Sequence, residues 1–177
     1  NAVEACADFA IALGINIPTG KDSLSMKQKY PDGDVIAPGT VIISAAGQCS
    51  NIKNVITPVA KVNGGSLYYL DFSQDEFHLG GSSFAQNLNK IGAETPTVLD
   101  PSYFKTAFNA LQKFIKKGYI QAGHDVGSGG LITSLLEMCF PSSSVGMTLN
   151  FTNFKEQDLV KILFSEKSAV LLQSREN

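Results

Sequence analysis

The chain has 177 residues, of which 44% are hydrophobic and 17% are charged, and its formal net charge is −2. These values provide enough apolar material for one packed domain or two small ones and argue against a disordered chain. The slightly acidic balance offers no basic surface for a nucleic acid. No apolar run reaches the roughly 18 residues that a membrane-spanning helix needs. We therefore expect a globular protein whose partners include neither nucleic acid nor membrane.

The three cysteines, Cys6, Cys49 and Cys139, lie far apart, and the chain has only two histidines. This pattern is not typical of a disulfide framework or of a cysteine–histidine zinc site. It favours a reducing, cytoplasmic location. The chain begins without Met and stops just after an apolar run at residues 169–173, so we interpret both ends as cut from something longer.

The first third of the chain predicts a helix, a turn and a strand. Apolar residues recur at helical spacing from Val3 to Leu13, and Gly14 stands where a helix-ending glycine belongs. Residues 30–34 have turn chemistry, and the small residues of 40–48 indicate a strand. Residues 51–63 have the composition of a connection, and we place the domain boundary near Thr57.

After Leu67 the predicted strands and helices alternate. Strands are expected over residues 66–72, 119–124, 147–151 and 169–173. Helices are expected over residues 84–91, 101–117, 131–139 and 154–164, the second of them with Asp100 as N-cap and Pro101 as its first residue. The alternation favours an α+β or α/β domain with a mixed sheet and packed helices.

The most distinctive segment is residues 123–131, which read GHDVGSGGL between an expected strand and an expected helix. Asp125 offers a carboxylate of the kind that Mg²⁺ takes together with phosphate oxygens. Gly127, Ser128 and Gly129 let backbone N–H groups approach an anion at a helix N-terminus. The segment is thus a candidate metal and nucleotide site. An ordinary glycine-rich turn, in which Asp125 caps the helix, explains the same residues and stays open.

Two further segments have a weaker claim to phosphate binding. Residues 20–23 read GKDS, but they lack the earlier glycine and the Ser or Thr after the lysine that a Walker A loop needs. A solvated loop is the simpler interpretation, although Lys21 can meet a phosphate and Asp22 or Ser23 a metal or a hydroxyl. Residues 79–83 form another glycine turn, with Ser82 as the expected N-cap. No nucleophile–base pair stands out, so catalytic residues stay unassigned.

Two of these segments together are similar to a known family. Residues 17–26, IPTGKDSLSM, resemble the IP-x-GKDS-x-SM signature of phosphoribosylformylglycinamidine synthase, and residues 124–131, HDVGSGGL, resemble its later HD-x-SDGGL segment. Between and after them, residues 56–58, 79–86 and 163–166 fall in the expected order. The resemblance covers nearly the whole chain, and the ordered set of motifs is specific.

The resemblance implies part of an ATP- and glutamine-dependent ligase of de novo purine biosynthesis, which converts formylglycinamide ribonucleotide to the amidine. It implies the aminoimidazole ribonucleotide synthetase-like fold. Residues 57–177 would be the C-terminal α/β domain of the second synthetase half, and residues 1–56 the end of the N-terminal sheet domain. The implied partners are small-molecule nucleotides and, in the same parent chain, the first synthetase half and a glutaminase domain.

Carried over by position, Asp125 resembles the family's Mg²⁺ ligand beside a bound ATP or ADP, in a site that the family uses as an auxiliary one. Residues 21–23 would line the cleft formed with the partner half. The family usually has Ser where this chain has Gly127 and Asp where it has Ser128. We expect the chain by itself to be inactive. The alternatives are another ATP-using member of the superfamily, such as a small-molecule kinase or a selenophosphate synthetase-like enzyme, and a structural piece that binds nothing.

Overall fold

The computed structural model describes residues 2–21 and 26–175. The chain divides into two compact units, Asn1–Ser50 and Asn51–Asn177, here called the N-terminal and the C-terminal unit. The domain boundary that the sequence favours near Thr57 stays a prediction. None of the helices in the described ranges is long and apolar enough to cross a membrane.

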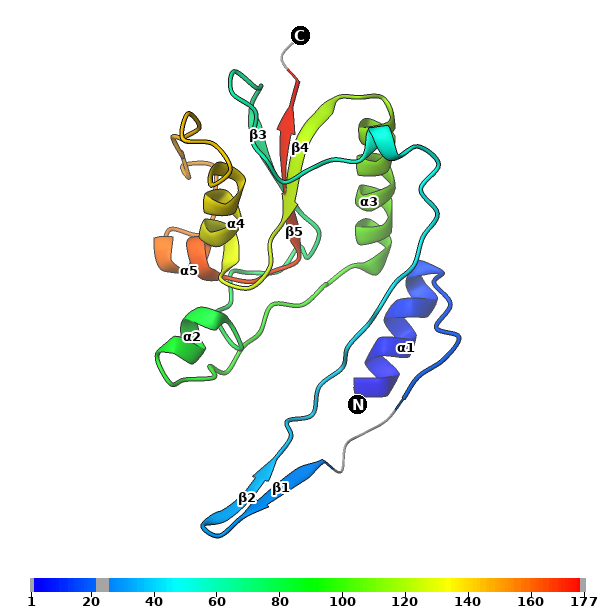
Figure 1. The fold of residues 1–177 in the computed structure, drawn as a ribbon, viewed down its shortest axis with the longest axis vertical. Helices are drawn as coiled ribbons and strands as arrows, with labels where there is room; N and C mark the ends of the chain where they lie inside the picture. Colours follow the sequence, from blue (N-terminus) through cyan, green and yellow to red (C-terminus); the bar gives the residue numbers. More distant parts are fainter. Residues whose placement is uncertain (1, 22–25, 176–177) are drawn as a thin grey trace. The chain divides into compact units, whose positions relative to one another are not determined.

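The helices are α1 (Ala2–Leu13), the short 3-10 helix η1 (Ile52–Asn54), α2 (Ser83–Asn87), α3 (Pro101–Lys116), α4 (Gly130–Cys139) and α5 (Leu159–Phe164). The strands are β1 (Lys27–Tyr30), β2 (Gly33–Ile36), β3 (Leu67–Asp71), β4 (Ile120–Asp125) and β5 (Ala169–Ser174) (Figure 1). This mixture of helices with small sheets confirms the α+β class.

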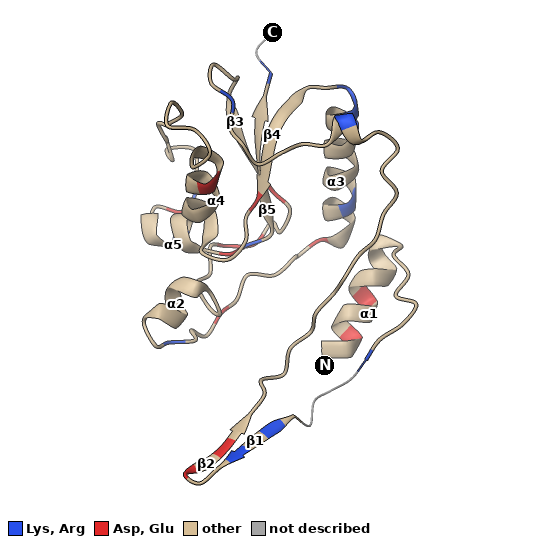
Figure 2. Cartoon of the chain, in the orientation of Figure 1, with Lys and Arg blue, Asp and Glu red and all other residues tan. Residues whose placement is uncertain are grey.

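The N-terminal unit contains α1 and a two-stranded hairpin. The helix ends at Gly14, whose φ of 73° is the left-handed conformation expected of a terminating glycine. Strands β1 and β2 pair in antiparallel register, with Lys27 Nζ 2.9 Å from Asp34 Oδ2 across the hairpin (Figure 2). Residues 40–48 form no strand in the described part of this unit, so that prediction is wrong. Small apolar residues favour a strand only where another strand is free to pair, and β1 and β2 pair with each other.

The C-terminal unit is built around a three-stranded sheet in the order β3-β5-β4. Both pairings, β3 with β5 and β4 with β5, are antiparallel. The mixed sheet that we expected is therefore not formed among the described strands. Strands β3 and β4 run in the same direction, but β5 lies between them, so no parallel pair arises.

Helices cover both faces of this sheet (Figure 1): α3 lies on one face, and α4 with α5 on the other. Side chains of β5 alternate between the two faces, Ala169 and Leu171 joining the cluster with α4, Leu172 the cluster with α3. In β4 a bulge lies between Ile120 and Ala122, and these two residues join opposite clusters. The apolar clusters on both faces fix the strand ends from which the loops emerge.

Local chemistry decides where the helices of this unit begin and end. The Asp100 side chain accepts hydrogen bonds from the N–H groups of Ser102 and Tyr103, which confirms the predicted cap of α3. Helix α5 begins only at Leu159, because Asp158 is its N-cap. Helix α2 ends at Asn87, four residues before the predicted end; Asn89 then takes a φ of 55°.

The expected strand at residues 147–151 is also absent from the C-terminal unit as described. Met147 and Phe151 instead pack, half-buried, against the apolar cluster on the α4 face of the sheet. The apolar residues of this segment recur because one side of a loop packs against the cluster. No strand pairs with the loop, so it does not become a strand itself.

Candidate functional site

The turn between β4 and α4 is held rigidly by its backbone. Strand β4 ends at Asp125, and the N–H of Val126 donates to Ala169 O at 2.9 Å, extending the contact with β5 by one residue. The Ser134 hydroxyl on α4 donates to Asp125 O at 2.8 Å. The Gly130 N–H donates to Gly127 O at 3.0 Å and closes the turn. A strand end, a helix start and a tight turn therefore meet at one fixed place.

The side chain of Asp125 is 83% exposed, and its Oδ1 lies 3.6 Å from Nδ1 of His124. His124 beside it is turned toward α4, where its Nε2 lies 2.9 Å from Glu137 Oε2. The other ring nitrogen, Nδ1, lies 2.7 Å from Asp125 O; a carbonyl can only accept, so Nδ1 is the donor in this bond. The histidine thus braces the backbone, and the Asp125 carboxylate stays available to a ligand.

The backbone N–H groups of the turn fall into two kinds. Those of Gly127 and Ser128 have no hydrogen-bond partner in the part of the chain that the structure describes. That of Gly129 donates to Glu166 Oε1 at 2.8 Å. The first two are therefore free donors beside Asp125, whereas the third is already used within the protein.

Two glycines of the turn are required by its geometry, and one is not. Gly129 and Gly130 have φ values of 88° and 74°. A Cβ on Gly130 would also lie 2.7 Å from Leu163 O, so only glycine fits there. At Gly127 the nearest atom to an added Cβ is Asp125 Oδ2 at 3.8 Å, which leaves room for a side chain. The departure from the family's Ser at this position is sterically neutral.

Glu166 is the residue that sequence reasoning missed. Its Oε1 accepts from Gly129 N at 2.8 Å and from Ser83 N at 2.7 Å, so one carboxylate oxygen joins the two glycine turns of the unit. The sequence signal was the 163–166 motif, which the resemblance used only for alignment. No pattern of spacing relates Glu166 to turns 37 and 83 residues earlier.

The donor set at Asp125 fits a hard cation held jointly with a phosphate. Among the described residues no group of three or more His, Cys, Asp or Glu side chains could hold a metal by itself. One exposed carboxylate suits Mg²⁺, which usually keeps waters and takes its remaining oxygens from a phosphate. The residues present therefore fit Mg²⁺ together with a phosphorylated ligand, and they do not form an all-protein metal cage.

The other predicted ligands lie in the N-terminal unit or outside the described ranges. Lys21 belongs to the N-terminal unit. Asp22 and Ser23 lie outside the described residues. Within the C-terminal unit the structure brings together Asp125, Gly127, Ser128 and Gly129; the roles of residues 21–23 stay predictions.

A buried polar cluster lies at the end of β3. The Lys167 side chain is 1% exposed, and its Nζ lies 2.9 Å from Asp71 Oδ2 and also donates to Asp75 O. Burial, and then the charge of Asp71, raise the pKa of Tyr69. Desolvation raises the pKa of Asp75, but hydrogen bonds from the Thr97 and Glu76 N–H groups, together with the charges of His78 and Lys167, leave it below its ordinary value. No pattern in the sequence predicts this cluster.

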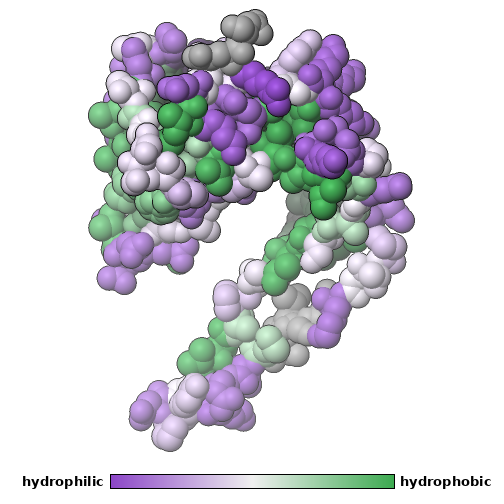
Figure 3. All heavy atoms as spheres, turned by 45° about the horizontal axis from the view of Figure 1, so that its top comes forward, coloured by the Kyte–Doolittle hydropathy of each residue, from purple (hydrophilic) through white to green (hydrophobic). Residues whose placement is uncertain are grey.

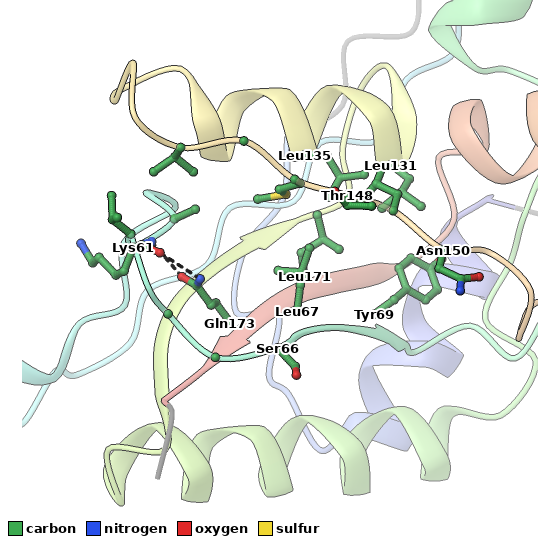
Figure 4. Close-up of a pocket in the computed structure, with 18 of the residues that line it drawn as sticks. Lys61, Ser66, Leu67, Tyr69, Leu131, Leu135, Thr148, Asn150, Leu171 and Gln173 are labelled. Atoms are coloured by element: carbon green, nitrogen blue, oxygen red, sulfur yellow. Dashed lines mark hydrogen bonds between the residues drawn. The ribbon is translucent and has the colours of Figure 1, made fainter.

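Two cavities of the C-terminal unit lie away from the β4–α4 turn. One of about 610 Å³ has Leu67, Leu131 and Leu171 among its lining (Figure 4). The amide of Gln173 at its edge is used by Lys61, accepting from its N–H at 2.8 Å and donating to its carbonyl at 3.2 Å. A second cavity of about 360 Å³ adjoins α2. Neither lining includes Asp125 or residues 127–130.

The fold and the glycine turn define a class of domain that comparison with known families identifies. Residues 64–175 match the family described as AIR synthase related protein, C-terminal domain, and the chain belongs to this family. Residues 1–48 match a second family, described as FGAR-AT PurM_N-like domain.

The curated relatives carry a more specific name. The chain is 38% identical to the probable phosphoribosylformylglycinamidine synthase, chloroplastic/mitochondrial, of Arabidopsis thaliana over 98% of its length, and 34% identical to the phosphoribosylformylglycinamidine synthase of Homo sapiens over 99%. It spans only 12% and 13% of the lengths of these two proteins. The family resemblance that the motifs indicated is confirmed.

Solved structures show the same fold. The chain matches PurLQS from Thermotoga maritima with a TM-score of 0.60 at 15% identity, covering 98% of this chain and 27% of that one. It matches T. maritima PurL complexed with AMPPCP with a TM-score of 0.58 at 14% identity, covering 98% of this chain and 26% of that one. At these identities the likeness establishes the fold alone.

Proposed function

We propose that this chain is part of a phosphoribosylformylglycinamidine synthase, the ligase that uses ATP and glutamine to convert formylglycinamide ribonucleotide to the amidine in purine biosynthesis. The names of the curated relatives and the order of the two family matches support this assignment. Residues 57–177 would form the C-terminal domain of the second synthetase half, and residues 1–56 the end of its N-terminal domain. The first half and a glutaminase domain would be partners in the same polypeptide.

Within that enzyme, we assign a Mg²⁺–nucleotide site to the β4–α4 turn. The observation that carries the assignment is the exposed Asp125 carboxylate beside the free N–H groups of Gly127 and Ser128. Asp125 would hold the metal, and the two N–H groups would donate to phosphate oxygens at the positive end of α4. Bound Mg²⁺ would neutralise phosphate charge. The exposed position of the turn suits a ligand shared with another part of the protein.

The nucleotide would be ATP or ADP, bound in an auxiliary site where it is held without being turned over. T. maritima PurL has been solved with ATP and with ADP, which supports adenine nucleotides as the ligand class. Lys21, Asp22 and Ser23 would line the cleft formed with the partner half. A cytoplasmic location stays a prediction, since the Arabidopsis relative is named as chloroplastic/mitochondrial.

The test is the Asp125→Ala variant of the complete protein, with Glu76→Ala as the control that removes an exposed carboxylate elsewhere in the same unit. Mg²⁺-dependent retention of ADP after gel filtration is expected to fall by at least about tenfold in Asp125→Ala and to stay unchanged in Glu76→Ala. Equal ADP retention in Asp125→Ala and the wild type would overturn the assignment of the nucleotide site to this turn.

Turnover of the same variant tests whether the site is auxiliary. We expect folded Asp125→Ala protein to keep glutamine- and substrate-dependent ATP hydrolysis after it has lost bound ADP. Loss of turnover with intact fold and intact bound ADP would contradict the auxiliary assignment and make the turn catalytic.

A further inference from the structure

Glu166 is placed between two helix starts that are far apart in sequence. Its Oε1 accepts from Ser83 N, the first residue of α2, at 2.7 Å, and from Gly129 N, just before α4, at 2.8 Å. Both distances are short for N–H···O bonds, as expected when the acceptor is charged. The same oxygen therefore fixes both turns at once.

Among the described residues, no Lys, Arg or His forms an ion pair with Glu166. Its negative charge is balanced by backbone N–H groups at the start of a ten-residue helix, where the peptide dipoles favour an anion. Glu166 thus occupies the Gly129 N–H, a donor that a bound anion would otherwise use.

We infer that Glu166 is a positioning residue: it locks the turn at 127–130 to the turn at 80–83 and occupies the Gly129 N–H, while the Gly127 and Ser128 N–H groups stay available for a ligand's phosphate. The identity of that ligand rests on the proposed function; the locking does not. The packing around the turn agrees with this role, since Gly130 lies directly against the backbone of Leu163 and Phe164, three and two residues before Glu166 in sequence. Loss of the Glu166 contact would release the Gly129 backbone in the turn that follows Asp125.

Hydrogen–deuterium exchange of the complete protein tests the locking directly. In Glu166→Ala, exchange is expected to rise by at least about tenfold in peptides covering both turns, while peptides of β3 and β5 keep their protection. Glu166→Gln keeps an acceptor oxygen at the same reach and is expected to stay within about threefold of the wild type. Glu166→Asp shortens the side chain and is expected to lose protection in at least one turn; it carries the test if Glu166→Ala does not fold.

The matched control is Glu156→Ala. Oε1 of Glu156 also accepts from two backbone N–H groups, those of Gln157 and Asp158, at 2.8 and 2.9 Å, but it joins no distant turns. Exchange at residues 80–83 and 127–130 should be unchanged in this variant. The inference is overturned if Glu166→Ala leaves either turn protected, or if Glu156→Ala exposes the two turns equally.

Binding of Mg-ADP separates the inference from the proposed function. Glu166→Ala is expected to weaken it by about tenfold through disorder of the turn, and Glu166→Gln is expected to restore it. A gain of ADP affinity in Glu166→Ala would overturn positioning and show that the carboxylate competes with phosphate. If the wild-type turn binds no Mg-ADP, the proposed function fails, and the exchange comparison still decides whether Glu166 locks the two turns.

Discussion

The ammonium group of Lys167 lies 2.9 Å from Oδ2 of Asp71, in a place where the lysine side chain is 1% exposed. The same Nζ donates to the backbone carbonyl of Asp75 and lies 4.3 Å from the centre of the Phe77 ring. A charge removed from water must be balanced by partners of this kind. Lys167 therefore ties the loop after β3 to the segment that leads into β5.

Replacing Lys167 by Met should destabilise the chain, because Asp71 would lose its only ion-pair partner among the described residues. Asp71 keeps hydrogen bonds from Ser73 and is 32% exposed, so we expect a loss of about 2–3 kcal/mol, at or below the range for breaking a fully buried pair. Urea denaturation measures it. The exposed Lys155→Met should stay within about 0.5 kcal/mol; equal losses in both variants would contradict the role of Lys167.

The glycines of the β4–α4 turn should respond unequally to substitution. Gly130→Ala places a Cβ 2.7 Å from Leu163 O on a backbone with φ of 74°, and we expect a loss of about 2 kcal/mol or more. Gly127→Ser restores the residue usual in the family, and the free space there predicts a change within about 0.5 kcal/mol. Thermal unfolding of the pair checks the difference. Comparable losses would contradict the difference in free space between Gly127 and Gly130.

Asp100 is expected to stabilise α3 through its cap. Its Oδ1 accepts from Ser102 N at 2.8 Å and Tyr103 N at 3.1 Å. Asp100→Ala should cost about 1 kcal/mol of unfolding free energy, whereas Asp100→Asn, which keeps the acceptor oxygen, should cost a few tenths. Chemical denaturation measures the unfolding free energy of the two variants. An Asn variant as unstable as the Ala variant would show that the charge of Asp100, and not the cap hydrogen bond, stabilises the helix.

The lowered pKa of Asp75 predicts an acid-dependent part of the stability. Its folded pKa lies below the ordinary value of 3.8, so the ionised form is favoured by folding. This contribution is complete above about pH 3.8 and is lost as the pH falls through the lower folded pKa. Asp75→Asn should therefore be less stable than the wild type at pH 7, with a smaller difference below pH 3. Unfolding free energies at both pH values test this, and a constant difference would contradict it.

Elements with local signals could be predicted from the sequence. Asp100 before Pro101 marks the start of α3 because cap and helix chemistry act within four residues. Gly14 ends α1 for a similarly local reason. The prediction of a strand at 40–48 is wrong because strand formation depends on a partner strand, which the segment itself does not specify. Phe154 lies outside α5 because it packs against Tyr69, Phe77 and Phe151, contacts that no periodicity reveals.

The residues of the candidate site also separate into those with a local sequence signal and those that depend on distant contacts. Asp125 and the glycines after it stand out because strand end, turn and helix start follow one another directly in sequence. Glu166 could not be found so, since its role comes from two hydrogen bonds to turns 37 and 83 residues away. The burial of Lys167 could not be predicted either, because it depends on the tertiary fold and not on the neighbouring residues.

The central place of β5 in the sheet has a consequence for the order of folding. Strand β3 pairs through Asp71 with Ala169, about 100 residues later, and β4 pairs with the same strand. At a synthesis rate of about 5–20 residues per second, β3 waits roughly 5–20 s on the ribosome before its partner has even been made. Until then both outer strands are unpaired edges. The sheet thus closes in one late, non-local step, and the nascent chain is most exposed to aggregation just before residues 169–174 emerge.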